Sequence, residues 1–294
     1  MIKVGIIGLQ DKYNGHPFSY SSIINGYSEK GYKLSEYSNI LKYLKKKRPN
    51  EFKINNVKIT HAWTQNPKLT KILCKASKIK NPVKNYLSMI GHIDALIIAR
   101  DDKHYEISKP FLQKEIPVFI DKPLSFKKNE LNFFKKYMFK GQLMSTSGFR
   151  FSSEIRILKK DIKKLGKVKF IIANVVNDWE RYGVHMLDII DEIGFLDIKK
   201  IQKIQSQHAS YNILTKKNVN IIINCLGKNS QIYNITVYGS KGKCSVDFKD
   251  NFTAFKNTLT NFFNMVVKRK LFIHPNNTIK IMNLINFASK LKKK

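Results

Sequence analysis

Short apolar runs separated by helical stretches fill the first 123 residues. The first run lies over residues 1–8, where Val4, Ile6 and Ile7 are followed by Gly8. Similar runs predict strands over 57–63, 94–99 and 117–120, and the stretches between them predict helices over 19–29, 68–77 and 104–114. Continuous apolar runs are typical of strands buried on both faces, so the alternation predicts a doubly wound parallel sheet with right-handed crossovers. A Lys- and Asn-rich stretch over 31–56 is interpreted as an insertion.

The pattern changes after Pro123. A helix over 128–137 and a strand over 143–147 come first, followed by strands over 168–176, 218–226 and 231–238 and by helices over 184–192, 255–268 and 278–291. Clustered strands with a few helices predict an α+β domain with a mostly antiparallel sheet. We therefore expect two domains, a Rossmann-like nucleotide-binding domain over residues 1–123 and a second domain over residues 124–294.

Length and composition agree with two folded domains. The 294 residues exceed the usual size of one domain, and 43% of them are hydrophobic. The chain has no run of eighteen apolar residues and begins directly in a predicted strand, so we expect no membrane span and no signal peptide. Cys74, Cys225 and Cys244 show no CxxC spacing, which favours a reducing cytoplasm and predicts no structural metal.

A net charge of +33 raises the possibility of a nucleic-acid-binding protein. However, 6 of the 54 basic residues are arginine, and the lysines are spread along the whole chain. Base recognition favours arginine, and nucleic-acid-binding proteins usually cluster their charge. The abundance of Lys, Asn and Ile indicates AT-rich coding instead. We expect non-specific binding to polyanions at low salt and no specific nucleic-acid partner.

The turn after the first strand is the expected site for a dinucleotide pyrophosphate. In the GxGxxG pattern of such turns, Gly8 fits the first position, but Gln10 and Tyr13 occupy the other two. Gly15 could restore a close approach to phosphate, and Ser19 lies at the predicted start of the helix. Two interpretations stay open, a modified phosphate-binding loop and an ordinary connection between strand and helix.

The second strand lacks the carboxylate that usually binds the adenosine ribose. It ends in Trp63, Thr64 and Gln65. Thr64 or Gln65 could hydrogen-bond the ribose, and Trp63 could stack on adenine. The alternative for Trp63 is a place in the hydrophobic core.

Two further positions carry candidate chemistry. Lys122 follows the strand over 117–120, and ligands of open α/β sheets bind at the carboxyl ends of strands. His185 and Asp188 lie three residues apart on a predicted helix, so the carboxylate could orient the imidazole as a general base. The alternatives are a surface turn for Lys122 and a structural pair for His185 and Asp188.

Taken in order, these segments resemble the Gfo/Idh/MocA family, named for glucose–fructose oxidoreductase, inositol dehydrogenase and a rhizopine-catabolism protein. The resemblance covers nearly the whole chain. Six segments carry it: Lys3 to Gly8, Asp94 to Ala99 with His104, Asp121-Lys122-Pro123 in place of the family's Glu-Lys-Pro, Gly148 to Phe151, Gly183 to Asp188, and Tyr238 to Gly242.

The resemblance implies hydride transfer between a secondary alcohol carbon of a sugar-type substrate and the nicotinamide of NAD or NADP. Lys122 would polarise the reacting oxygen, His185 would accept the hydroxyl proton, and Asp188 would hold His185. The implied cofactor contacts are Gly8, Gln10, Gly15, His16, Ser19, Trp63, Thr64, Gln65, Ala99, Arg100, Asp101, His104, Asp121 and Lys122, and the implied substrate contacts are Arg150, Arg181 and Tyr182. We expect Lys122 and His185 to share a cleft between the domains, and a homodimer or homotetramer formed through the open face of the second sheet.

Several positions depart from the family pattern. Arg181 stands four residues before His185, where many members have an acid, and Arg100-Asp101-Asp102 replaces the usual Thr-Pro. Together with the segments over 15–17 and 63–65, these replacements resemble a branch linked to surface-polysaccharide pathways. The alternative function is a non-redox relative that binds a nucleotide or a sugar nucleotide.

Overall fold

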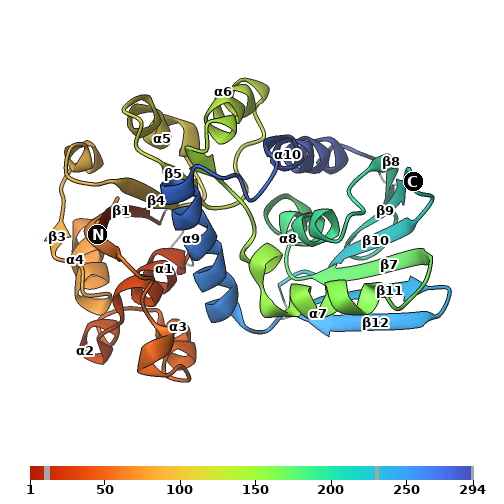
Figure 1. The fold of residues 1–294 in the computed structure, drawn as a ribbon, viewed down its shortest axis with the longest axis horizontal. Helices are drawn as coiled ribbons and strands as arrows, with labels where there is room; N and C mark the ends of the chain where they lie inside the picture. Colours follow the sequence, from red (N-terminus) through yellow and green to blue (C-terminus); the bar gives the residue numbers. More distant parts are fainter. Residues whose placement is uncertain (10–13, 229–231, 293–294) are drawn as a thin grey trace. The chain divides into compact units, whose positions relative to one another are not determined.

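The computed structural model describes residues 1–9, 14–228 and 232–292 (Figure 1). These residues form two compact units. Unit 1 comprises Met1–Ser145 and Phe255–Pro275, and unit 2 comprises Thr146–Ala254 and Asn276–Lys294. Gln10, one of the predicted cofactor contacts, lies outside the described residues.

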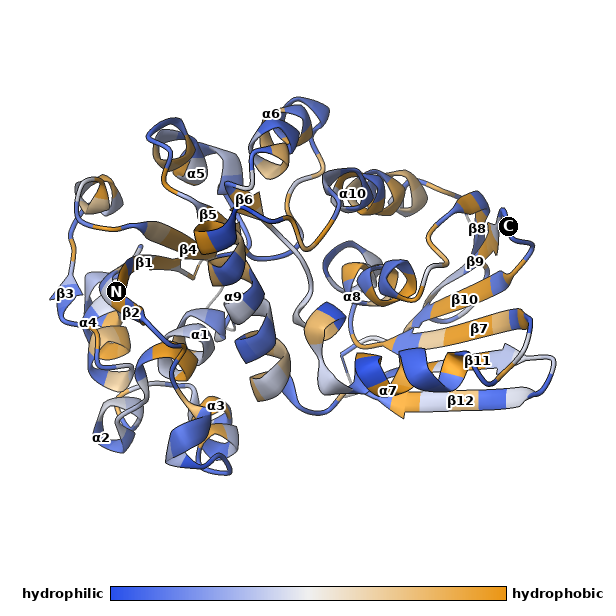
Figure 2. Ribbon diagram, in the orientation of Figure 1, coloured by the Kyte–Doolittle hydropathy of each residue, from blue (hydrophilic) through white to orange (hydrophobic). Residues whose placement is uncertain are grey.

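Unit 1 contains the predicted parallel sheet. Its order is β3-β2-β1-β4-β5-β6, and every neighbouring pair is parallel. The strands are β1 (Ile2–Gly8), β2 (Val57–Thr64), β3 (Asn81–Pro82), β4 (Ala95–Ala99), β5 (Val118–Ile120) and β6 (Leu143–Met144). All five residues of β4 are buried, and the central strands are among the most hydrophobic parts of the ribbon in Figure 2. This is the order of dinucleotide-binding folds, so the predicted fold class is confirmed for this unit.

Helices surround this sheet. They are α1 (His16–Asn25), α2 (Glu29–Tyr32), α3 (Ser38–Leu44), α4 (Pro67–Ala76), α5 (His104–Gln113), α6 (Lys128–Phe139) and the part of α9 (Asn251–Lys268) from Phe255 onward, with short 3-10 turns at η1 (Pro49–Glu51) and η2 (Tyr86–Met89). The first helix begins and ends earlier than predicted. Pro17 suits the first turn of a helix because it has no N–H to leave unpaired, and Gly26, at φ 81°, ends the helix.

The predicted insertion over 31–56 forms part of the core of unit 1. Tyr32, Ile40 and Leu44 are buried, although lysines surround them in the sequence. A Cβ on Gly31 would lie 2.5 Å from the backbone of Ala76, so α2 packs directly on the end of α4. The sparse apolar residues of this segment are therefore sufficient to fold it against unit 1.

Unit 1 also extends beyond the predicted boundary at residue 123. Strand β6 adds to the parallel sheet beside β5. The ring of Phe262 in α9 packs on Phe119 of β5, with 5.8 Å between the ring centroids. Helix α9, far along the chain, therefore completes the core of unit 1. The local sequence pattern of α9 does not indicate which sheet it packs on.

Unit 2 contains a six-stranded sheet of order β12-β11-β7-β10-β9-β8. Its strands are β7 (Val168–Val175), β8 (Ile198–Ile204), β9 (Ala209–Thr215), β10 (Asn220–Cys225), β11 (Tyr233–Gly239) and β12 (Gly242–Asp247). The β7–β10 pair is parallel and the other four pairs are antiparallel, which confirms the predicted mostly antiparallel sheet.

The helices of unit 2 are α7 (Ser153–Ile162), α8 (Trp179–Glu192) and nearly all of α10 (Pro275–Ser289), with a 3-10 turn at η3 (Gly148–Phe151). Helix α8 begins five residues before the predicted start at residue 184. Asp178 explains this start, because its carboxylate accepts a hydrogen bond from the Arg181 N–H (2.8 Å) and caps the helix. His185 and Asp188 both lie on α8.

Candidate active site

In unit 1, the start of α1 lies close against the end of β1. A Cβ on Gly8 would lie 2.4 Å from Cγ of Pro17, so glycine at this position permits the close packing of strand and helix. The first-turn amides are already engaged: the His16 N–H donates to Asn14 Oδ1 (3.1 Å) and the Phe18 N–H to Gly15 O (3.1 Å). A pyrophosphate at this helix start would find fewer free backbone donors than in the usual dinucleotide turn.

The structure corrects two of the predicted phosphate contacts. A Cβ on Gly15 would lie 2.5 Å from Cδ1 of Ile40, so this glycine makes room for α3 rather than for a ligand. Ser19 is buried in α1 and cannot present its hydroxyl at the surface. The reason in both cases is the 31–56 segment, whose helix α3 covers this side of α1.

His16 and Asp121 form a hydrogen-bonded pair at the end of β5. Nδ1 of His16 makes a short contact with one carboxylate oxygen of Asp121, while the Tyr20 hydroxyl (3.3 Å) and the Lys122 N–H (2.9 Å) donate to the other. Burial raises the pKa of Asp121, but the neighbouring His16 and Lys122 outweigh this effect and lower it overall. Asp121 therefore holds His16 from within the core, and the imidazole is the more exposed partner.

Residues from the ends of β2 and β4 meet around Arg100. Its guanidinium donates to Gln65 Oε1 (3.2 Å) and Gly8 O (3.4 Å), pairs with Asp102 (2.6 Å) and lies over the Trp63 ring, 5.6 Å from the centroid. The Trp63 Nε1–H donates to Lys84 O (3.2 Å), which fixes the indole. The segments over 63–65 and 100–102, noted separately in the sequence, thus form one polar cluster at the carboxyl edge of the sheet.

Three predicted cofactor contacts are satisfied inside the protein. The Thr64 hydroxyl is buried and bonds to Asn66 O (2.8 Å) and Thr70 Oγ1 (2.9 Å). The ring nitrogens of buried His104 each lie 2.9 Å from a backbone carbonyl, those of Leu124 and Arg100. Ala99 is fully buried. Thr64 and His104 therefore stabilise the loops of unit 1 through these bonds, and the predicted contacts of Thr64, His104 and Ala99 with the cofactor stay predictions. Asp101 and Lys122 are half-buried at the same edge.

In unit 2, His185 is held by a residue that the sequence analysis missed. Its Nδ1 lies 2.6 Å from the Ser147 hydroxyl, and its ring packs among Phe149, Tyr182 and Tyr233. Ser147 is 38 residues earlier in the chain, directly before the Gly148 to Phe151 segment. Nothing in residue spacing connects the two, since their contact depends on how η3 packs against α8.

Asp188 is bonded to a different set of groups from the one predicted. Its carboxylate accepts hydrogen bonds from the Ser147 N–H (2.6 Å), the Thr146 hydroxyl (3.0 Å) and the Arg150 guanidinium (3.1 Å). Burial raises the pKa of Asp188, and Arg150 with the two other donors counteracts that rise. Asp188 therefore supports the backbone that carries Ser147, and Ser147 in turn contacts His185.

Arg150, a predicted substrate contact, is buried between carboxylates of α8. Its side chain is 4% exposed and pairs with Asp188 (3.1 Å), Glu192 (3.1 Å) and, through a short contact, Asp191. Each donor group of the guanidinium faces an acid, so the residue fixes η3 to α8 instead of presenting a cation to substrate. Arg181 and Tyr182 are more exposed, and their predicted contact with substrate stays a prediction.

Other candidate chemistry is limited in the part of the chain that the structure describes. No group of His, Cys, Asp and Glu side chains there could hold a metal ion, and no helix there is long and apolar enough to cross a membrane. Burial raises the pKa of Cys74 and Cys225 to about 12, so neither is a reactive thiol at neutral pH. The three cysteines are unpaired as disulfides.

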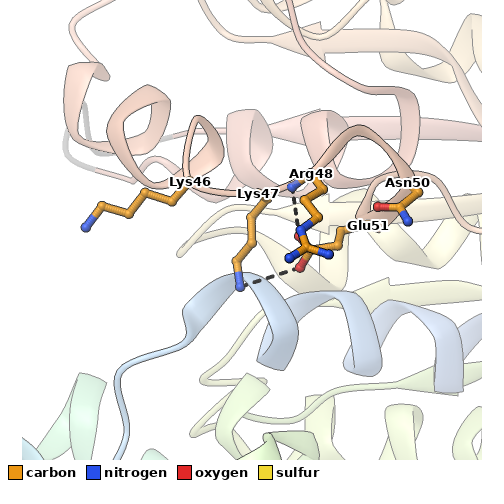
Figure 3. A pocket seen from close by; sticks show the side chains of 5 residues that line it. All are labelled: Lys46, Lys47, Arg48, Asn50 and Glu51. Carbon is orange, nitrogen blue, oxygen red and sulfur yellow. Dashed lines mark hydrogen bonds and ion pairs between the residues drawn. The ribbon is translucent and has the colours of Figure 1, made fainter.

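The segment over 31–56 contains a shallow pocket of about 450 Å³, and no predicted site residue lines it. Figure 3 shows its five lining side chains, which are Lys46, Lys47, Arg48, Asn50 and Glu51. Glu51 accepts a hydrogen bond from the Arg48 N–H (2.7 Å) and pairs with Lys47 (3.9 Å). All of the lining belongs to one surface segment, so the pocket adds no catalytic group.

Comparison with known proteins gives a family match over part of unit 1 and a fold for the whole chain. Residues 34–148 match the model of the Gfo/Idh/MocA family, an oxidoreductase family with an NAD-binding Rossmann fold. The fold resembles that of myo-inositol 2-dehydrogenase from Lactobacillus plantarum, at 17% identity and a TM-score of 0.78, over 98% of this chain and 96% of that chain. No curated protein matches the chain.

Two further solved structures have the same fold and contain ligands. One is scyllo-inositol dehydrogenase from Lactobacillus casei with NAD(H) and scyllo-inositol, at 15% identity and a TM-score of 0.76, over 99% of this chain and 96% of that chain. The other is a 3-ketoreductase from Actinomadura kijaniata with TDP-benzene and NADP, at 12% identity and a TM-score of 0.77, over 99% of this chain and 98% of that chain. These structures show the same fold, and the family model over residues 34–148 agrees with the resemblance indicated by the sequence motifs.

Proposed function

We propose, from the membership of residues 34–148 in the Gfo/Idh/MocA oxidoreductase family, that this chain interconverts an alcohol and a ketone on a sugar or sugar-nucleotide substrate. The family match carries the proposal, because it assigns the nicotinamide dinucleotide and the oxidoreductase class. Scyllo-inositol and a TDP derivative in the solved relatives support a polyol, sugar or sugar nucleotide as substrate. A place in surface-polysaccharide metabolism belongs to the same proposal.

At the carboxyl edge of the parallel sheet in unit 1, several side chains carry groups that could hydrogen-bond a dinucleotide. His16 offers an imidazole where the backbone amides of α1 are engaged, Gln65 offers an exposed amide at the end of β2, and Arg100 supplies a cation at the end of β4 that Gln65 and Asp102 hold in place. We propose that His16, Gln65 and the Trp63 indole contact the cofactor. When bound, NAD or NADP supplies the hydride acceptor or donor.

We propose that this chain's own residues manage the proton. In alcohol oxidation, Nε2 of His185 takes the hydroxyl proton as the C–H hydride leaves carbon, so the C–O bond becomes a carbonyl. The Lys122 ammonium donates a hydrogen bond to the same oxygen and stabilises the negative charge that develops there. Because Lys122 belongs to unit 1 and His185 to unit 2, their action on one substrate stays a prediction.

The first experiment is a binding titration. We expect Trp fluorescence or calorimetry to show saturable binding of NADH, of NADPH, or of both. His16→Ala should weaken that binding, and His208→Ala, at an exposed position in unit 2, serves as the control. Turnover is then assayed with inositols, hexose nucleotides and their uronic acids by following nicotinamide absorbance. A chain that binds neither dinucleotide would contradict the proposal.

The alternative, a non-redox relative that binds a sugar nucleotide, has one observation in its favour. The first-turn amides of α1 are engaged by Asn14 and Gly15, which removes donors that a pyrophosphate uses in the usual turn. Tight binding of a sugar nucleotide without effect of either dinucleotide, and without turnover, would select this alternative.

The second sheet has a face suited to self-association. Ile172 of β7 and Ile222 of β10 are paired in register and only half-buried, while their neighbours Ile171, Ile221 and Ile223 are buried on the opposite face. On the same face as Ile222 lies Asn212, whose Oδ1 is buried without a hydrogen-bond partner among the described residues. We propose that this half-buried face of β7 and β10 forms the contact of a homodimer or homotetramer.

A further inference from the structure

The structure points to Ser147 as the residue that positions the proposed proton acceptor, and this inference rests on the proposed function. Many relatives by resemblance have an acid four residues before the histidine, and here that position is Arg181. A histidine that accepts a proton at Nε2 needs a hydrogen-bond partner at Nδ1 that holds the ring and its tautomer. In this structure the partner at Nδ1 is the Ser147 hydroxyl, at 2.6 Å.

Ser147 is itself held rigidly. The residue is fully buried, its N–H donates to Asp188 Oδ2 (2.6 Å), and its hydroxyl accepts a hydrogen bond from the Phe149 N–H (3.2 Å). Asp188 in turn is paired with Arg150 (3.1 Å). The position of the hydroxyl oxygen is thus fixed by the backbone of η3 and by a buried ion pair, so the His185 ring has a fixed partner.

A hydroxyl can donate one hydrogen bond and accept two, so the tautomer of His185 decides which role Ser147 takes. Its oxygen has two acceptor sites, of which the Phe149 N–H takes one and an Nδ1–H of His185 can take the other. In that arrangement Nε2 of His185 carries a lone pair and can accept the substrate proton. The Nδ1–H···Oγ bond also persists after Nε2 is protonated, so the ring does not need to turn during the reaction.

We propose that Ser147 accepts the Nδ1–H of His185 and so keeps Nε2 available for the hydroxyl proton of the substrate. Asp188 and Arg150 act one step further away, by holding Ser147. This account gives a positioning role to a neutral hydroxyl where many relatives by resemblance use an acid.

The test measures the tautomer of His185 by nuclear magnetic resonance and does not need a substrate. In the full chain with ¹⁵N-labelled histidine, the His185 signals are assigned by their loss in His185→Gln. We expect the Nδ1–H form in the parent and a shift towards the Nε2–H form in Ser147→Ala. Ser152→Ala is the matched control, because Ser152 is also a buried capping serine of unit 2, accepting from the Ile155 N–H (3.3 Å), and should leave the His185 signals unchanged.

Two results would overturn the proposal: an Nε2–H form of His185 in the parent, or identical His185 signals in the parent and Ser147→Ala. If Ser147→Ala does not fold, Ser147→Cys keeps the size of the side chain and replaces the oxygen by a weak acceptor. Where turnover is found, kcat in Ser147→Ala should fall about tenfold or more with KM little changed, because positioning supplies part of the about hundred- to ten-thousandfold that general-base help contributes. Absence of turnover in the parent would contradict the proposed function and leave the tautomer result to decide on Ser147.

Discussion

Replacing Arg150 by methionine tests whether this residue is structural. Methionine keeps much of the length and apolar surface of the side chain but removes the cation that pairs with three carboxylates, those of Asp188, Asp191 and Glu192. The side chains of Arg150 and Asp188 are each 4% exposed, so water cannot replace the lost partner. Breaking a buried ion pair by removing one partner costs about 3–5 kcal/mol.

That loss should appear as a large change in melting temperature. At about 3 °C per kcal/mol for a domain of this size, the melting temperature of Arg150→Met should fall by roughly 9–15 °C. Arg156→Met is the control, because Arg156 is an exposed arginine of α7, and its melting temperature should change little. The measurement is thermal unfolding followed by circular dichroism, together with urea unfolding to obtain the free energy.

The pH dependence sharpens the test. Burial raises the pKa of Asp188, and removing Arg150 takes away the main group that opposes this rise. A carboxyl with a raised pKa in the folded state binds more protons folded than unfolded, so its unfavourable contribution grows as pH rises above about 4 and disappears below it. The deficit of Arg150→Met should therefore shrink on acidification, and Asp188→Asn in the same chain should recover part of it. A deficit below 1 kcal/mol, or one independent of pH, would refute the structural role.

Three further predictions concern other parts of the molecule. Lys122→Met should reduce kcat by about a hundredfold or more, whereas Lys127→Met, whose side chain is 72% exposed, should not; equal activity of the two variants would exclude Lys122 from catalysis. If the chain self-associates as proposed, Ile222→Lys should sediment as a monomer in analytical ultracentrifugation with its circular dichroism spectrum retained, and a sedimentation coefficient equal to that of the parent would rule out the proposed face. Burial, with help from His92, lowers the pKa of His61 in the folded protein. The stability that His61 contributes is therefore complete above about pH 6.5 and is lost as pH falls through its folded pKa. His61→Asn should flatten the change in urea midpoint between neutral and acidic pH, and parallel pH curves for parent and variant would disprove this.

The parallel sheet could be predicted because each strand carries its own signal. The residues of β4 and those of β1 from Val4 onward are continuously apolar and buried, and such runs predict a strand buried on both faces without reference to any distant residue. The edge strands β8 and β12 were missed for the opposite reason. Three of the seven residues of β8 are lysine and most residues of β12 are exposed, and both are strands because the neighbours β9 and β11 bind their backbones. Strand β9 was also missed.

For the candidate site, too, the sequence indicated some residues and the structure alone showed the others. Family motifs identified Lys122, His185 and Asp121, since a short motif keeps its residues in sequence. The partners of these residues come from elsewhere in the chain: His16 lies 105 residues before Asp121, and Ser147 lies 38 residues before His185. Hydrogen bonds across such separations depend on how helices and turns pack, which residue type and spacing do not specify.

The roles of Gly15 and Arg150 show the limit most clearly. In the sequence, a glycine near a phosphate-binding turn and an arginine in a segment that resembles a family motif both suggest contact with a ligand. In the folded chain, Ile40 of α3 occupies the space that a side chain at Gly15 would need. Arg150 is buried among three acids of α8. The sequence determined which residue types could do chemistry and which strands would be buried. Only the tertiary structure decided which of those groups remain exposed to a ligand, because burial and pairing are properties of the packed chain.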